Sequence, residues 1–216
     1  MKIVHIPRVV AAAVSLFAAF GSAPASAVSS VYFVLNQSNI NASPYQDGQN
    51  YLQVTISDNI NGNIDFKVET LAPLSSNAGS NYGIDSFGFN TLQSVSLANI
   101  VAPTGWTLQT TQNQDGFGNF TDVANTTGQY RQDPLMFSIT GISGDTAMDY
   151  VNLSTGTAGE GNVYFAAHVA GFSTQVTSGY FGGSEQISTP VPEADTYAML
   201  LAGLGLVGFA ARRKLS

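Results

Sequence analysis

The chain of 216 residues contains no cysteine, and charged side chains make up only 10% of it. Without cysteine there is no disulfide, no thiolate metal site and no thiol nucleophile. A domain built from this sequence must therefore be stabilised by a packed core or by bound ions.

Positive charge is scarce between residues 28 and 189. Lys67 and Arg131 are the only basic side chains there, against twelve acidic ones, which gives a net charge of −10. Such a region is repelled by nucleic-acid phosphates and by anionic lipid. We therefore expect no nucleic-acid partner. The remaining polar residues are mainly Asn, Gln, Ser, Thr and Gly, a composition that suits contact with hydrated polysaccharide.

The N-terminus has the three parts of a secretory signal peptide. Lys2 and Arg8 are basic, residues 9–20 are apolar, and Ala25-Ser26-Ala27 provides small side chains for cleavage. We expect signal peptidase to cut after Ala27, so that residues 1–27 are a signal peptide and the chain is exported.

The C-terminus has a hinge, an apolar run and a basic cluster. Residues 197–211 carry no charge, and as a helix they extend about 22 Å, less than the roughly 30 Å hydrocarbon core of a bilayer. A single transmembrane helix is expected here. The basic residues after it predict a cytoplasmic end and an exported domain; they are Arg212, Arg213 and Lys214. The alternative is an unprocessed tail anchor.

These residues resemble the PEP-CTERM sorting signal. The hinge Val191-Pro192-Glu193-Ala194 stands where that family has Pro-Glu-Pro, with Ala194 replacing the second proline. The resemblance covers residues 191–216 and implies recognition by an exosortase, a membrane transpeptidase of Gram-negative bacteria that make exopolysaccharide. Pro192 and Glu193 are then the recognition residues, and the basic cluster is the membrane stop.

The region between the two ends alternates with a period of two residues, which is typical of strands. Residues 51–57 and 64–69 alternate apolar and polar side chains on either side of Asn61-Gly62, and this pattern predicts a β-hairpin. Further strands are expected at residues 31–35, 94–100, 107–111, 135–140 and 162–172.

No convincing amphipathic helix and no internal repeat occurs in this region. The sequence therefore predicts an all-β fold, an antiparallel β-sandwich of the jelly-roll kind, with an up-and-down barrel as the alternative. We assign residues 28–177 to this domain, residues 178–190 to a glycine-rich linker and residues 191–216 to the sorting signal.

Catalytic residues are few. His168 is the only histidine after signal cleavage, and no Gly-x-Ser-x-Gly motif occurs. A Ser-His-Asp triad would have to use His168 with Asp145 or Asp149. We interpret His168 instead as a partly buried strand residue and expect no enzymatic activity, with an exported hydrolase as the least favoured alternative.

Two binding sites are hypothesised. Oxygen-bearing side chains on a glycine-containing loop suit Ca²⁺, although the spacing is not that of an EF-hand; they are Asn113, Asp115, Asn119 and Asp122. Trp106 and Tyr130 are candidates for stacking on a sugar ring, although a single tryptophan in a β-sandwich is more often a core residue, and a core position is the favoured interpretation of Trp106.

These patterns together predict an exported surface or extracellular-matrix protein with a structural or adhesive role in a biofilm. Its partners would be signal peptidase, exosortase and extracellular polysaccharide, and the membrane before processing. The alternatives are a carbohydrate-binding module and a calcium-stabilised adhesin.

Overall fold

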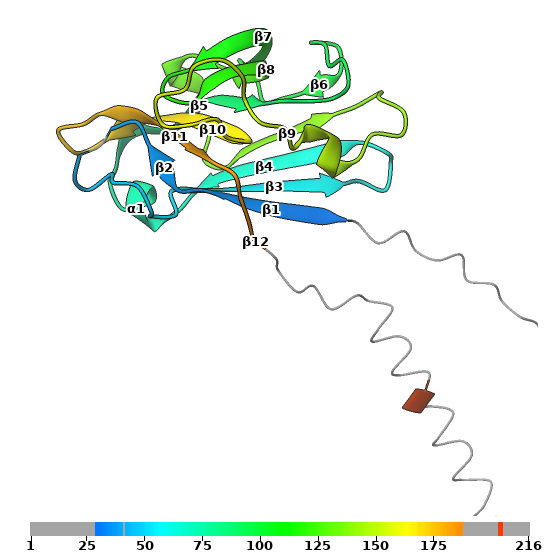
Figure 1. Cartoon of the computed structure of the whole chain (residues 1–216), viewed down its shortest axis with the longest axis horizontal. Coiled ribbons are helices and arrows are strands. Elements are labelled where there is room, and N and C mark those ends of the chain that lie inside the picture. Colours follow the sequence, from blue (N-terminus) through cyan, green and yellow to red (C-terminus); the bar gives the residue numbers. More distant parts are fainter. Residues whose placement is uncertain (1–28, 41, 188–202, 205–216) are drawn as a thin grey trace, which may run out of the picture.

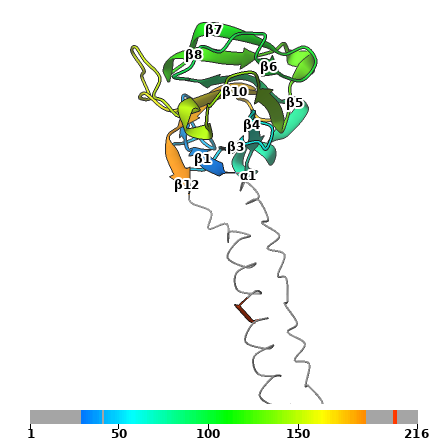
Figure 2. The ribbon, with the colours of Figure 1, turned by 90° about the vertical axis from the view of Figure 1, so that its right-hand side faces the viewer.

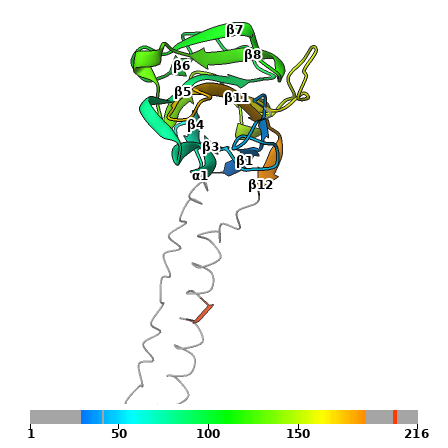
Figure 3. The ribbon, with the colours of Figure 1, turned by 90° about the vertical axis from the view of Figure 1, so that its left-hand side faces the viewer.

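The computed structural model describes residues 29–40, 42–187 and 203–204 (Figure 1). The strands of these residues form two antiparallel sheets of six strands each. Sheet 1 has the order β12-β1-β3-β4-β9-β6, and sheet 2 has the order β2-β11-β10-β5-β8-β7. Figures 2 and 3 view the molecule from its two ends, with β7 and β8 at one side and β1 and β12 at the other.

The strands of sheet 1 are β1 (Ser30–Leu35), β3 (Leu52–Asp58), β4 (Ile64–Thr70), β6 (Ile100–Val101), β9 (Leu135–Ile139) and β12 (Glu185–Ile187). Those of sheet 2 are β2 (Gln37–Ser38), β5 (Ala78–Phe89), β7 (Thr107–Gln114), β8 (Gly118–Asn125), β10 (Phe165–Phe172) and β11 (Ser178–Gly183). Short helices are α1 (Ala72–Ser75), η1 (Gly128–Tyr130) and η2 (Ala147–Tyr150).

The predicted hairpin is confirmed as β3–β4. Val54 pairs with Val68 and Ile56 with Phe66, and the buried residues alternate with partly exposed ones along both strands. Gly62 adopts a φ of 72° in the connecting turn, a left-handed conformation that glycine enters without steric cost.

The other predicted strands are confirmed in part. Those at 31–35, 107–111 and 135–140 correspond to β1, β7 and β9, and 162–172 overlaps β10. Of the strand expected at 94–100, only Ile100 is in a strand, because the preceding residues form turns around Asn99. The strands β2, β5, β8, β11 and β12 were not predicted.

The two-sheet sandwich is confirmed, and the barrel alternative is not, because the sheets are separate. The jelly-roll detail does not match. The hairpins β3–β4, β7–β8 and β10–β11 each remain within one sheet, whereas successive jelly-roll strands wrap between the two sheets.

The core lies between the inner faces of the sheets. Phe66 is at its centre, with ring centroids 4.6 Å from Phe137, 5.2 Å from Phe89 and 5.6 Å from Tyr150. The pair with Phe137 is stacked, the pair with Tyr150 is edge-to-face and the pair with Phe89 is tilted. Such contacts between buried rings add to the stabilisation from burial. Removing one such buried ring costs about 3–5 kcal/mol, so this cluster can stabilise the domain without disulfides.

The outer face of sheet 2 carries a second, smaller core. Ala166 of β10 pairs with Gly88 on one side and with Gly182 on the other, which makes a row of small residues. The rings of Phe117 and Phe120 pack on this row: a Cβ on Gly182 would lie 2.5 Å from Phe117, and one on Gly88 would lie 2.8 Å from Phe120. Glycine is therefore needed at both positions.

The linker expected at residues 178–190 is wrong over residues 178–187. Ser178–Gly183 pairs with β10 as β11, and Glu185–Ile187 pairs with β1 as β12. The glycines of this segment reflect close packing rather than a flexible connection: a Cβ on Gly183 would lie 2.4 Å from the carbonyl oxygen of Val34. The domain thus extends to Ile187.

The signal peptide (1–27), the transmembrane helix (197–211) and the sorting residues lie outside the described residues. Within the part of the chain that the structure describes, no helix is long and apolar enough to cross a membrane.

Candidate functional site

A β-bulge in β5 creates the most distinctive polar feature of the domain. Ser86 pairs with His168, but Ile84 pairs with Val169, so Asp85 is an extra residue in β5. Ile84 and Phe87 both enter the core, and Asp85 and Ser86 between them both line the outer face of sheet 2. An extra residue of this kind redirects side chains that regular alternation would place on opposite faces.

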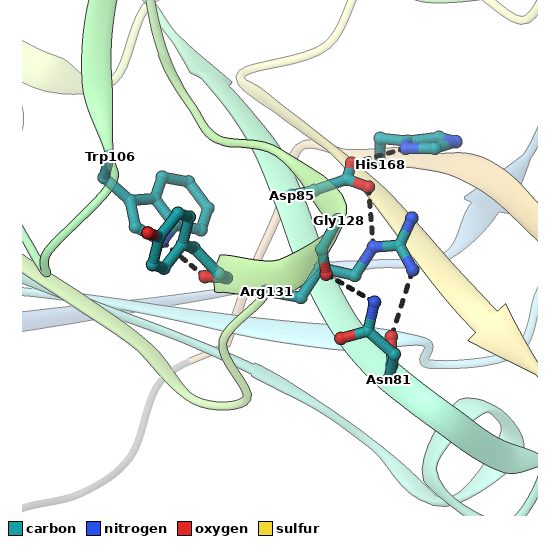
Figure 4. Close-up of polar contacts among 7 residues, drawn as sticks. Asn81, Asp85, Trp106, Gly128, Arg131 and His168 are labelled. Atoms are coloured by element: carbon teal, nitrogen blue, oxygen red, sulfur yellow. Dashed lines mark hydrogen bonds and ion pairs between the residues drawn. The ribbon is translucent and has the colours of Figure 1, made fainter.

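Asp85 is the centre of an ion-paired network (Figure 4). Its Oδ2 accepts a bond of 2.8 Å from Arg131 Nε, and its Oδ1 lies 2.5 Å from Nδ1 of His168. Burial alone would raise the pKa of Asp85, but the bonds and charges of His168 and Arg131 outweigh it and hold that pKa below its ordinary value. Asp85 is therefore a carboxylate at neutral pH.

Arg131 is fixed by backbone contacts as well as by Asp85. Its Nη1 donates to the carbonyl oxygen of Asn81 at 3.0 Å, and the Asn81 side chain donates in turn to the carbonyl oxygen of Gly128 (Figure 4). Asn81 has a φ of 56°, a left-handed conformation that Asn tolerates better than most residues. The guanidinium is only 19% exposed, so the pair with Asp85 is largely shielded from water.

His168 lies between Asp85 and an aromatic neighbour. It pairs with Tyr180 of β11, and the two ring centroids are 4.5 Å apart. Because the carboxylate of Asp85 accepts at Nδ1, that nitrogen carries a proton, and Nε2 is the ring nitrogen left for another partner. Within residues 29–40 and 42–187, Nε2 has no protein partner. Burial, with the charges of Asp85 and Asp115, raises the pKa of Tyr180.

These groups line a cleft of ≈ 290 Å³ on the outer face of sheet 2. Strands β5, β7, β8, β10 and β11 all contribute to it. Amide and hydroxyl side chains predominate; the lining residues are Asp85, Ser86, Gln109, Gln112, Asn113, Gln114, Val123, Asn125, Thr126, His168 and Tyr180. The cleft can thus offer many hydrogen bonds and little apolar surface.

The cleft contains part of the arrangement of a hydrolase but not a triad. His168 lines it beside Asp85, which replaces the Asp145 or Asp149 considered from the sequence. Asp145 instead accepts from Tyr150, and Asp149 caps η2. The Ser86 hydroxyl donates to Gln114 at 3.2 Å rather than to His168, so no Ser-His-Asp chain of bonds is made.

The four oxygen-bearing residues proposed for Ca²⁺ enter three separate contacts. Asn113 donates to Asn119, Asp115 accepts from Asn39, and the buried Asp122 accepts from the Thr121 hydroxyl. Burial raises the pKa of Asp122. No group of three or more Asp, Glu, His or Cys residues placed to hold a metal occurs among the described residues.

Trp106 does not form the exposed platform proposed for sugar stacking. It is 7% exposed, belongs to the main core, and its Nε1 donates to the carbonyl oxygen of Tyr130 at 2.9 Å. The core position favoured for Trp106 is confirmed. Tyr130 is exposed, and its ring lies over Gly105, where a Cβ would be 2.5 Å from it.

Sequence reasoning missed Asp85 and Arg131 as site residues. Two signals existed. The run Ile84-Asp85-Ser86-Phe87 interrupts the alternation with two polar residues between two core residues, and Arg131 is one of only two basic side chains in the domain. Neither signal predicts that Asp85 and Arg131, which are 46 positions apart in the sequence, are in contact.

Comparison with known proteins gives one match. The family model described as the PEP-CTERM protein-sorting motif matches residues 190–214. No curated protein matches the chain, and no solved structure matches it. The chain is thus an exported protein sorted at the membrane toward the cell surface. More particularly, it carries the PEP-CTERM motif and is an exosortase substrate. The match includes none of the described β-sandwich.

Proposed function

We propose that this protein is a structural or adhesive component of the cell surface or the extracellular polysaccharide matrix. The observation that carries the proposal is the PEP-CTERM motif at residues 190–214, which marks the chain for exosortase processing. Signal peptidase would first remove residues 1–27, and the tail would hold the domain at the membrane until the exosortase acts. The β-sandwich would then be released or joined to the matrix.

The properties of the domain support a role in display. It has an aromatic core that needs no disulfide, and a net charge of −10 that favours solubility. The absence of a serine–histidine bond in the polar cleft supports binding rather than catalysis at that place.

A carbohydrate-binding module is the second candidate. It no longer rests on Trp106, which is buried, but on the amide-rich cleft of sheet 2. The four residues considered for Ca²⁺ give the calcium-stabilised adhesin less support, because their contacts are separate.

The test is the mass and location of the protein in a host that contains an exosortase. Wild type is compared with Pro192→Ala/Glu193→Ala, and Glu69→Ala is the control because it removes an acidic side chain from β4 and leaves the tail intact. We expect wild type and Glu69→Ala to lose the tail near residue 193 and leave the membrane, while the double variant keeps it. Retention of the tail by wild type would refute the proposal.

A further inference from the structure

We infer that the cleft on the outer face of sheet 2 is a binding site for a neutral glycan. The inference rests on the proposed function, and it names the class of ligand and the residues that bind it. The first argument is the hydrogen-bonding inventory of the cleft. Gln109, Gln112 and Asn125 each carry two N–H donors and a carbonyl acceptor. Gln112 uses one donor on the Thr110 carbonyl oxygen at 3.3 Å, and the Asn125 amide oxygen accepts from the Thr107 hydroxyl at 3.5 Å, so most of these groups remain for a ligand. Adjacent sugar hydroxyls both donate and accept, so they match amides better than they match a charged group.

The second argument is charge. Asp85 is the only acidic side chain lining the cleft, and Arg131 neutralises it at 2.8 Å. The cleft is therefore close to neutral and has no unpaired charge for an ionic ligand. The domain's net charge of −10 further disfavours acidic polysaccharides, whereas a neutral chain is not repelled.

The third argument is the preorganisation of His168. Asp85 fixes the ring through Nδ1, and Tyr180 packs beside it at 4.5 Å. Nε2 is thus a polar atom in a fixed position, and no bond to it is made within the part of the chain described. The bulge that places Asp85 on this face explains how the fold fixes this orientation. A side chain held in advance loses less conformational entropy when a ligand hydroxyl binds.

The size of the cleft and its position across several strands fit a short segment of a longer polysaccharide. The cleft volume, ≈ 290 Å³, is at the small end of the roughly 300–1,000 Å³ range of small-molecule sites. Gln109 and Gln112 of the edge strand β7 are exposed beside it, so neighbouring sugar units can continue past β7. We assign Gln109, Gln112 and His168 to direct contact and Asp85 and Arg131 to positioning.

The test is affinity electrophoresis of the full-length chain in a zwitterionic detergent, since sugar-headed detergents would compete. Gels contain dextran, soluble starch, xylan or galactomannan as neutral polysaccharides, and alginate as the acidic one. We expect at least one neutral polysaccharide to retard the protein and alginate to have no effect. This readout uses the unprocessed chain, so its failure is distinct from a failure of exosortase processing.

The variants are Gln109→Ala/Gln112→Ala and the matched control Gln175→Ala. All three glutamines are exposed, so the core is not changed, and emission from Trp106 verifies folding. Each lost amide bond weakens binding about 2- to 12-fold, and we expect the double variant to lose roughly 5- to 100-fold while Gln175→Ala binds as wild type. The inference is wrong if no neutral polysaccharide retards wild type, if the double variant binds unchanged, or if alginate retards wild type equally.

Discussion

Asp85→Asn is the most informative test of the network beneath the cleft. The substitution keeps the shape of the side chain and removes its charge, so Arg131 is left at 19% exposure without an anion. Exposed ion pairs contribute about 0–1 kcal/mol, and breaking a fully buried pair costs about 3–5 kcal/mol. Asp85 and Arg131 are 13% and 19% exposed, which is nearer the buried case. We expect the free energy of unfolding to fall by about 2–3 kcal/mol at pH 7.

The assay is urea unfolding followed by the fluorescence of Trp106, the only tryptophan and a core residue. Asp115→Asn is the control, because Asp115 is exposed and accepts only from the Asn39 side chain. Arg131→Met completes a double-mutant cycle, for which we expect a coupling of about 1–2 kcal/mol.

The same variant predicts a pH dependence. The pKa of Asp85 is lowered in the folded protein, so its contribution to stability is present above the ordinary aspartate pKa of 3.8 and is lost as pH falls through the lower folded value. In Asp85→Asn the free energy of unfolding should therefore decline less steeply than in wild type as the pH falls below 3.8. A fall in the free energy of unfolding of less than about 0.5 kcal/mol at pH 7 would refute a network held by the charge of Asp85. So would a variant whose stability declines at acidic pH as steeply as that of wild type.

Two further predictions concern packing and a buried hydroxyl. Gly88→Ala places a Cβ 2.8 Å from the Phe120 ring, and we expect it to lower the free energy of unfolding in urea by about 1–3 kcal/mol. The control is Gly144→Ala, whose Cβ meets no atom within 4 Å and should cost only the strain of its left-handed φ. Equal losses in the two variants would exclude the contact with Phe120 as the cause. Burial, with the charge of Asp47, raises the pKa of Tyr51 to about 12, so its contribution to stability is full below pH 10 and is lost as pH rises toward 12. Tyrosinate absorbance of wild type minus Tyr51→Phe measures this, and ionisation of Tyr51 near pH 10 would contradict it.

The fold could be predicted where the alternation is local. In β3 and β4 each apolar side chain enters the core, and the Asn-Gly turn fixes the register, so two strands of seven residues each and the turn between them carry the whole signal. The strand β11 could not be predicted in this way. Its glycines are required by Ile40, Phe117 and Val34, residues that approach from elsewhere in the chain. Sequence alone gives the same glycines to linkers and to closely packed strands.

The candidate site was less predictable than the fold. Alternation correctly placed His168 on a partly buried strand face, but its partner Asp85 depends on a bulge set by the pairing of β5 with β10. Trp106 illustrates the reverse case. Its position beside Pro103 and Gly105 is also compatible with an exposed turn, and the packing of the two sheets confirms the core position that was favoured for a single tryptophan.

The pairing of β12 with β1 has a consequence for the timing of export. β1 is among the first parts of the domain to leave the cytoplasm, and Tyr32 meets its partner Ile187 only after nearly the whole domain has followed. From Ile187 to the start of the sorting match at residue 190, an extended chain reaches at most about 11 Å. Closure of sheet 1 thus depends on residues that directly precede the sorting match. An exosortase bound at the start of that match would therefore work within about 11 Å of chain from the strand that closes this edge of sheet 1.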